Sequence, residues 1–282
     1  MSKVRPAAVA GSFYHHEKNI LSYDIESLLD GAQSRADKEY SVPKAIIVPH
    51  AGYIYSGPVA ASAYRLLEPV RDRIKRVVLL GPVHRVAVIG LALPGVNAFQ
   101  TPLGEVAIDA DAVAMVEHLD QVVFSDAAHA QEHSLEVKLP FLQTVLDDFS
   151  IVPFAVGNAS AEQVAEVLET LWGGDETLIV ISSDLSHFHP YQVAHKIDTH
   201  TVEKILDFQS NVSHEQACGG TPVNGLLIAA QKHRLKSQLL DLRNSGDTAG
   251  DKSRVVGYAS FAFTAEQPAD HGDNYGDDQK HD

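Results

Sequence analysis

The sequence predicts a layered α/β fold. Apolar, β-branched runs at 45–48 and 178–181 are typical of strands that are covered on both faces. Segments with helical periodicity alternate with such runs for most of the chain. Three of the predicted strands are followed within a few residues by a histidine, at His50, His84 and His187.

The first half of the chain alternates helical stripes with apolar runs. Apolar residues at helical spacing predict one helix around 20–29, a second that starts after Gly57-Pro58, and a third at 109–119. The stripes comprise Ile20, Leu21, Ile25, Leu28 and Leu29 in the first helix, and Val59, Ala60, Ala63, Leu66 and Leu67 in the second. The expected strands are 45–48, 76–81, 87–93 and 122–124, with 104–108 pairing to a neighbour as a ribbon.

The second half continues the alternation. A helix is expected at 132–146, where Pro140 should kink or split it. Another begins at Ser160, whose capping box is completed by Gln163, and Thr221-Pro222 should open a later one. The remaining expected elements are the strands 151–156, 177–182, 236–243 and 254–264 and the helix 191–208.

The length allows one large α/β domain or two small ones within residues 1–266. Residues 267–282 have almost no apolar side chains and are expected to form a disordered acidic tail. A net charge of −15 without a basic run argues against a nucleic-acid or anionic-membrane surface. A single cysteine excludes an intrachain disulfide. With neither a signal core nor a membrane-length apolar stretch, the sequence predicts a cytoplasmic protein.

The strand-end histidines predict a functional cleft. Ligands of open α/β sheets bind outside the carboxyl ends of the strands, so His50, His84, Asp184 and His187 are expected around one site. Such residues suit metal binding or proton transfer. The chain has 15 histidines, so most must be structural or exposed. Asp184 is open to three interpretations: metal ligand, partner of an imidazole, or cap of the next helix.

Two further clusters carry possible chemistry. Glu132 and Glu136 lie four residues apart and would repel on a helix face unless a buried partner or a cation relieved them. His133 between them is either an acid/base or substrate clamp, or part of a polar helix start. Cys218 precedes a helix N-terminus, which favours a thiolate, although a lone cysteine is usually a small buried apolar residue.

Several other chemistries lack their sequence signatures. There is no Gly-x-Ser-x-Gly elbow, phosphate loop or dinucleotide fingerprint. No pair of cysteines is available for a structural zinc site.

Taken together, these residues resemble the Memo family, cytosolic proteins related in fold to class III extradiol dioxygenases. The resemblance runs from about residue 5 to residue 263 and rests on ordered motifs. They are 10–14 (AGSFY), 49–53 (PHAGY), 80–82 (LGP) with His84, 132–136 (EHSLE), 182–184 (SSD) with His187, and 217–219 (ACG).

The resemblance implies a single class III extradiol dioxygenase-like domain with a mixed sheet between helices. It also implies a metal site at His50, His84 and Cys218, with Asp184 and His187 in the same cleft. The family's metal is iron or copper, and a redox role and association with radical-SAM and AMMECR-type proteins are implied as well. One departure is that Val83 and Arg85 stand where the family usually has Ser and a second His.

Two functions from different classes follow. The first is a metal-dependent redox enzyme, with His133, His187 and Asp184 as candidate catalytic residues and iron, copper or zinc as the metal. The second is a non-catalytic module that binds a peptide, or a metal without turnover. The expected ligand is a small molecule or a peptide.

Overall fold

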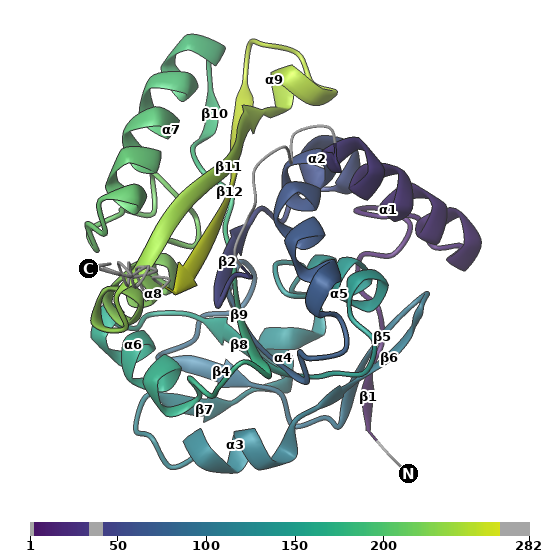
Figure 1. The fold of residues 1–282 in the computed structure, drawn as a ribbon, viewed down its shortest axis with the longest axis vertical. Coiled ribbons are helices and arrows are strands. Elements are labelled where there is room, and N and C mark those ends of the chain that lie inside the picture. The colour runs from purple at the N-terminus through teal and green to yellow at the C-terminus, as the bar shows by residue number, and fades with distance from the viewer. Residues whose placement is uncertain (1–2, 34–41, 266–282) are drawn as a thin grey trace, which may run out of the picture.

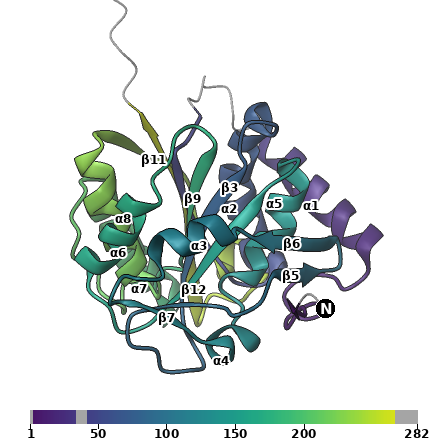
Figure 2. The same cartoon turned by 90° about the horizontal axis from the view of Figure 1, so that it is seen from below.

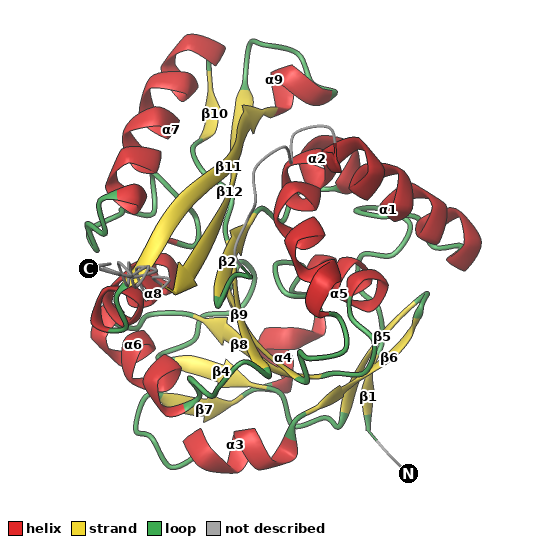
Figure 3. Cartoon of the chain, viewed as in Figure 1, coloured by secondary structure: helices red, strands yellow, loops and turns green. Residues whose placement is uncertain are grey.

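A computed structural model of the chain describes residues 3–33 and 42–265. Within these residues, one large mixed sheet runs through the molecule with helices on both of its faces (Figure 1; Figure 3). This architecture confirms the predicted single α/β domain. The predicted acidic tail at 267–282 lies outside the described residues.

The strands are short except near the carboxyl end of the domain. They are β1 (Val4–Arg5), β2 (Ala45–Val48), β3 (Arg76–Pro82), β4 (Leu91–Leu93), β5 (Ala98–Thr101), β6 (Gly104–Ile108), β7 (Val122–Phe124), β8 (Ser150–Val156), β9 (Thr177–Ser182), β10 (His187–His189), β11 (Leu235–Asn244) and β12 (Val255–Ala265).

The helices include two short 3-10 segments, η1 and η2. The elements are α1 (Lys18–Gln33), α2 (Tyr53–Tyr64), η1 (Arg65–Val70), α3 (Ala110–Val116), α4 (Asp126–Ala130), η2 (Glu136–Lys138), α5 (Leu139–Val145), α6 (Ala161–Thr170), α7 (Tyr191–Leu206), α8 (Gly220–Lys232) and α9 (Ser245–Thr248). No helix of the described residues is long and apolar enough to span a bilayer.

The sheet has the strand order β1-β5-β6-β8-β3-β9-β2-β12-β10, with β11 paired to β12, and β4 joining β7 to β8. Its centre, β8-β3-β9-β2, is parallel. The strand β12 runs antiparallel to β2 and starts the mixed portion of the sheet. The strands β3, β9 and β2, whose ends carry predicted site residues, are therefore consecutive in the sheet.

The central strands are buried on both faces, which explains their continuous apolar sequences. In β3, Val77 and Leu79 belong to the core formed with α1, α2 and α5, whereas Val78 and Leu80 belong to the core formed with α6 and α8. Successive side chains of a strand point to opposite faces, so both cores draw on the same run. Figure 2 shows the two helical layers on opposite sides of the sheet.

Several local predictions are confirmed. The strands 122–124 and 177–182 have the predicted bounds. Ser160 caps α6 and forms the expected capping box with Gln163. The ribbon at 104–108 is β6, paired antiparallel with β5.

The predicted helix at 132–146 is wrong in its first part. Residues 132–135 are not helical, and the helical segment begins only at Glu136. The segment is divided at Leu139, where the 3-10 helix η2 ends and α5 begins with Pro140 in its first turn, so the expected split is confirmed. A proline there costs no hydrogen bond, because the first N–H groups of a helix have no partner within the helix.

Three other expectations differ from the structure. The helix α2 starts at Tyr53 and includes Gly57-Pro58, because burial of its apolar face outweighs the local preference of these residues. Ile20 is 46% exposed and does not belong to the buried stripe of α1. The predicted strand 87–93 is shortened to β4, which begins after Gly90.

A close approach at Gly81 predicts a measurable cost for a side chain there. A Cβ at Gly81, at the end of β3, would lie 2.8 Å from Ser134 Oγ and 3.0 Å from Leu135 Cδ2. We expect Gly81→Ala to lower the free energy of unfolding by about 1–3 kcal/mol through overpacking. Urea denaturation measures this change.

The matched control is Gly31→Ala in α1, where no atom of the described residues beyond the backbone of the helix itself lies within 4 Å of the added Cβ. This substitution should stabilise the protein by about 0.5–1 kcal/mol, since alanine has a higher helix propensity than glycine. Equal effects of the two substitutions would contradict the close packing of β3 against the segment that follows His133.

Candidate metal centre

The candidate centre lies at the carboxyl ends of β2 and β3. His50 follows β2 by two residues, and His84 follows β3 by two residues. The strand β9, which lies between them in the sheet, ends at Ser182 and leads into Asp184. The parallel order thus brings together side chains that are far apart in the sequence, at the edge where α/β proteins bind ligands.

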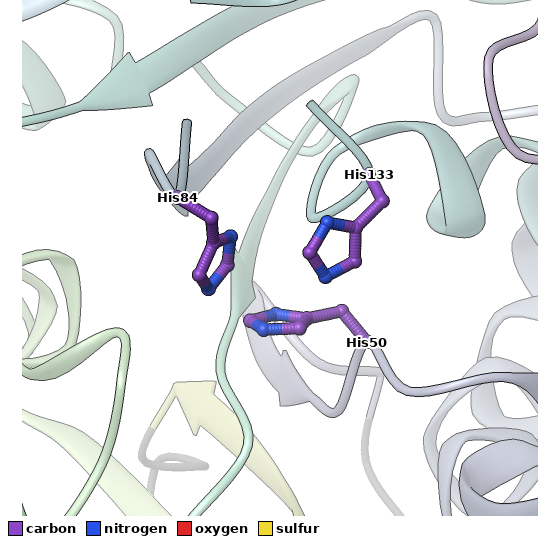
Figure 4. A group of neighbouring side chains, drawn as sticks. All are labelled: His50, His84 and His133. Carbon is purple, nitrogen blue, oxygen red and sulfur yellow. The ribbon is translucent and has the colours of Figure 1, made fainter. Parts of the chain in front are cut away.

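A third imidazole joins from outside the strand ends. His133 comes from the segment between α4 and η2, and one ligand atom from each of His50, His84 and His133 lies within 4.8 Å of the others. The ring centroids of His84 and His133 are 4.6 Å apart, and that of His50 lies 5.2 Å and 5.4 Å from them. Figure 4 shows the three rings facing a common point.

Glu132 orients two of these residues. Its Oε1 lies 2.9 Å from His84 Nδ1 and accepts hydrogen bonds from the backbone N–H groups of His133 and Ser134. Its Oε2 accepts the backbone N–H of His84 at 2.6 Å. Burial raises the pKa of Glu132, but its hydrogen bonds and the charge of His84 outweigh burial and lower the pKa to about 2. The resulting carboxylate favours a proton on His84 Nδ1, which leaves Nε2 for a ligand.

Ser182 orients the remaining imidazole. The Ser182 hydroxyl donates its proton to the carbonyl of Ser134 at 2.6 Å. The hydroxyl must therefore accept a hydrogen bond from His50 Nδ1, which lies 2.8 Å away. This arrangement assigns the proton of His50 to Nδ1 and leaves Nε2 unprotonated.

Burial keeps two of the imidazoles neutral. It lowers the pKa of His50 well below its ordinary value, and the charges of Lys138, His84 and His133 lower it further. Burial also lowers the pKa of His133 to about 4, although Glu132 opposes the shift. At neutral pH both rings therefore keep the lone pair that a metal requires.

Cys218 adjoins His50 and lies just before α8. Its Sγ is 3.3 Å from His50 Nε2 and accepts the backbone N–H of Asp184 at 3.3 Å. Burial, assisted by the charge of Asp184, raises the pKa of Cys218 to about 12. Burial therefore opposes the thiolate that the position before the helix was expected to favour.

Asp184 is buried beside His50 and does not cap a helix. Its Oδ1 accepts the backbone N–H of His50 at 2.6 Å, and its Oδ2 lies 3.9 Å from His50 Nε2. The next helix, α7, begins only at Tyr191 with Pro190 as its N-cap residue. Burial raises the pKa of Asp184, although its hydrogen bond with His50 and the charge of Lys138 oppose the shift. The helix-cap interpretation is therefore wrong.

The structure also places a buried lysine beside the centre. Lys138 is 1% exposed and donates a hydrogen bond to the carbonyl of Pro49. Burial lowers the pKa of Lys138 to about 7, against the opposing charges of Asp184 and Cys218. Lys138 was not among the predicted site residues, although its position between Val137 and Leu139 in an apolar segment indicates a buried lysine.

The predicted residues therefore differ in their placement. His50, His84 and His133 share one group, while Cys218 and Asp184 flank His50. His187, at the start of β10, lies close enough for its charge to lower the pKa of His50 and of Asp184. It does not belong to the group of three histidines. Sequence reasoning also missed the roles of Glu132 and Ser182 as orienting partners.

The chemistry of the donor set fits a transition metal. Imidazole nitrogen suits zinc, copper and iron, and metal-bound histidines usually donate their other N–H to a carboxylate or similar acceptor. Here the Nδ1 atoms of His84 and His50 have such partners in Glu132 and Ser182. The exposed position of His84 leaves the group accessible from the surface.

The fold and this group of side chains define an α/β protein with a possible three-histidine metal site at the carboxyl edge of its sheet. The chain belongs to the Memo-like protein family, whose model matches residues 5–262.

Curated relatives support this assignment, and one solved structure shares the fold. A MEMO1 family protein of Sulfurisphaera tokodaii is 36% identical, over 92% of this chain and 99% of the relative. A MEMO1 family protein of Aquifex aeolicus is also 36% identical, over 93% and 99%. The crystal structure of the uncharacterized protein JW3007 from Escherichia coli K12 matches with a TM-score of 0.50 and 14% identity, over 78% of this chain and 99% of that one, and shows the fold alone.

The orienting role of Glu132 predicts a loss of metal affinity in Glu132→Gln. An amide cannot accept all the hydrogen bonds that the carboxylate accepts from His84, His133 and Ser134. We expect zinc affinity to fall by about 10–100-fold, as measured by competition with a chromophoric chelator. The control is Glu169→Gln, since Glu169 also contacts an imidazole, that of His233, but lies in α6. An unchanged affinity in Glu132→Gln would contradict this role.

The lowered pKa of His133 predicts a loss of stability in mild acid. In the unfolded chain His133 binds a proton below its ordinary pKa of about 6.5, whereas in the folded protein it binds a proton only below a pKa of about 4. Stability should therefore be full above pH 6.5 and decrease towards pH 4. In His133→Gln, measured without metal, we expect this decrease to be smaller by about 1–2 kcal/mol. Identical pH profiles of the two proteins would contradict a buried neutral imidazole.

Proposed function

We propose that this protein is a metal-dependent redox protein that holds non-haem iron or copper at the strand-end centre. The observation that carries the proposal is the convergence of His50, His84 and His133 on a common point, with two of the rings oriented by Glu132 and Ser182. Membership of the Memo-like family supports the same site. When bound, iron or copper would supply electron-transfer chemistry that no side chain of the centre provides.

His50, His84 and Cys218 are the proposed ligands. In a tetrahedral site with bonds of about 2.0–2.3 Å, neighbouring ligand atoms lie roughly 3.5 Å apart. The observed 3.3 Å between His50 Nε2 and Cys218 Sγ is already close to this spacing. Because burial raises the pKa of Cys218 to about 12, its ligation as a thiolate would release a proton. A thiolate ligand favours copper or zinc, whereas iron fits a harder donor set.

His133, Asp184 and His187 are the proposed acid/base residues. His133 is neutral at neutral pH and faces the same point as the two imidazole ligands, so it can accept a proton there. Asp184 has a raised pKa and touches the backbone of His50. His187 lies farther out, on β10. A three-histidine ligand set is the competing arrangement, in which His133 replaces Cys218.

The alternative function is a non-catalytic module that binds a metal or a peptide in the same cleft. Metal analysis of protein purified without chelator, followed by oxygen-uptake measurements with candidate catechols, separates the two functions. Metal without uptake favours the binding module. Association with radical-SAM and AMMECR-type proteins and a cytoplasmic location belong to this proposal as well.

The ligand set predicts a distinct optical signature. Cobalt(II) added to the metal-free protein should give a near-ultraviolet thiolate-to-cobalt charge-transfer band, because thiolate is a soft donor. The band has one possible source, since Cys218 is the only cysteine. We expect the band to disappear in Cys218→Ser and to persist in His133→Ala.

The opposite pattern would contradict the thiolate ligand. If Cys218→Ser bound cobalt as tightly as the unaltered protein while His133→Ala lost binding, the metal would be held by three histidines. His84→Ala serves as the reference, because both arrangements require His84 and should lose affinity with it.

A further inference from the structure

A buried carboxylate outside the imidazole group connects the centre to the N-terminal segment. Glu136 is fully buried, and its Oε2 accepts hydrogen bonds from Arg5 Nη1 at 2.5 Å and from the backbone N–H of Ala8 at 2.8 Å. Its Oε1 accepts the Tyr14 hydroxyl at 2.6 Å and the backbone N–H of Val9 at 3.0 Å. We call residues 5–14 the N-terminal strap, and Glu136 holds it at four points.

The strap also holds the segment that carries Glu132 and His133. The Arg5 side chain is 4% exposed. Its Nη2 donates to the carbonyl of Glu132 at 2.7 Å, and its Nε donates to the carbonyl of His129 at 2.7 Å. Because the Glu132 carboxylate orients His84 and His133, the strap reaches both rings through a single intervening residue.

The other end of the strap contacts the segment that follows His50. The carbonyl of Phe13 accepts the backbone N–H of Tyr53 at 2.8 Å. The ring of Phe13 lies against His133, with centroids 4.7 Å apart. The turn that brings Phe13 there uses Gly11 with a φ of +84°, a conformation that other residues rarely adopt.

We propose that the N-terminal strap belongs to the metal centre and that the strap sets the relative positions of His50, His84 and His133. Glu136 and Arg5 are positioning residues, since they act through Glu132 and through the backbone. The inference rests on the proposed metal site and adds a coupling to it. Because the strap favours the arrangement that binds metal, bound metal must in turn favour the docked strap.

Hydrogen exchange tests this coupling directly. The probe is zinc, and the amides are those of the strap, including Ala8 and Val9, which donate to Glu136. If undocking of the strap abolishes binding, zinc at 100 times its dissociation constant should slow strap exchange by up to about 100-fold. Residues 161–170 of α6 serve as the internal control and should be protected less.

Equal exchange of the strap with and without zinc, in protein shown to bind zinc, would overturn the inference and leave the proposed metal site intact. Failure of the unaltered protein to bind zinc, iron or copper would overturn the proposed function, and the inference with it. The two failures are therefore distinguishable in one experiment.

Variants test the positioning role. Glu136→Gln keeps the shape of the side chain but removes the charge opposite Arg5, and we expect zinc affinity to fall by about 10–100-fold. The matched control is Asp109→Asn, because Asp109 also pairs with an arginine, Arg76 at 2.7 Å. Arg76 is the first residue of β3, at the end of the strand opposite to His84. Equal affinities in both variants would contradict the proposal.

Gly11→Ala keeps the test valid if Glu136→Gln does not fold. The nearest atom to the added Cβ lies 3.7 Å away, so the substitution causes no steric clash and destabilises only the backbone conformation of the turn in the strap. A penalty for the left-handed conformation should weaken zinc affinity by about 3–10-fold. Gly31→Ala in α1 is the control and should leave affinity unchanged, whereas an unchanged affinity in Gly11→Ala would overturn the role of the strap.

Discussion

The candidate metal centre depends on one buried carboxylate. Glu132 is 2% exposed and is satisfied by donors from the segments that carry two of the imidazoles. A buried charge is costly unless such donors compensate it. The bonds that stabilise Glu132 are therefore the same bonds that hold His84 and His133 near His50. The orientation of the rings and the stability of this part of the fold have a common cause.

Burial governs the rest of the centre. It lowers the pKa of His50, His133 and Lys138, and it raises the pKa of Asp184 and Cys218. In the metal-free protein these shifts all disfavour charge, as expected for groups withdrawn from water. A metal ion would reverse this balance for Cys218, because a coordinated thiol is deprotonated. The parallel order β3-β9-β2 makes the arrangement possible by placing three strand ends side by side.

The sequence predicted most of the sheet and the strand-end histidines, because both follow from local patterns. Continuous apolar runs mark strands buried on two faces, and a histidine after such a run is visible without coordinates. The partners of the imidazoles were not predictable in this way. Glu132 and Ser182 lie about fifty residues apart, and only tertiary packing brings both to Ser134. Pro140 indicated the division of the helical segment, which falls between η2 and α5, whereas the non-helical course of residues 132–135 was not predicted.

X-ray absorption at the metal edge of the zinc-loaded protein tests the central claim most directly, because it reports the atoms bound to the metal. We predict imidazole scattering from at least two histidines, with nitrogen at about 2.0–2.1 Å and one sulfur at about 2.3 Å. The imidazole signal should decrease in His84→Ala. A spectrum of oxygen neighbours alone, unchanged by that substitution, would contradict a metal centre built on His50 and His84.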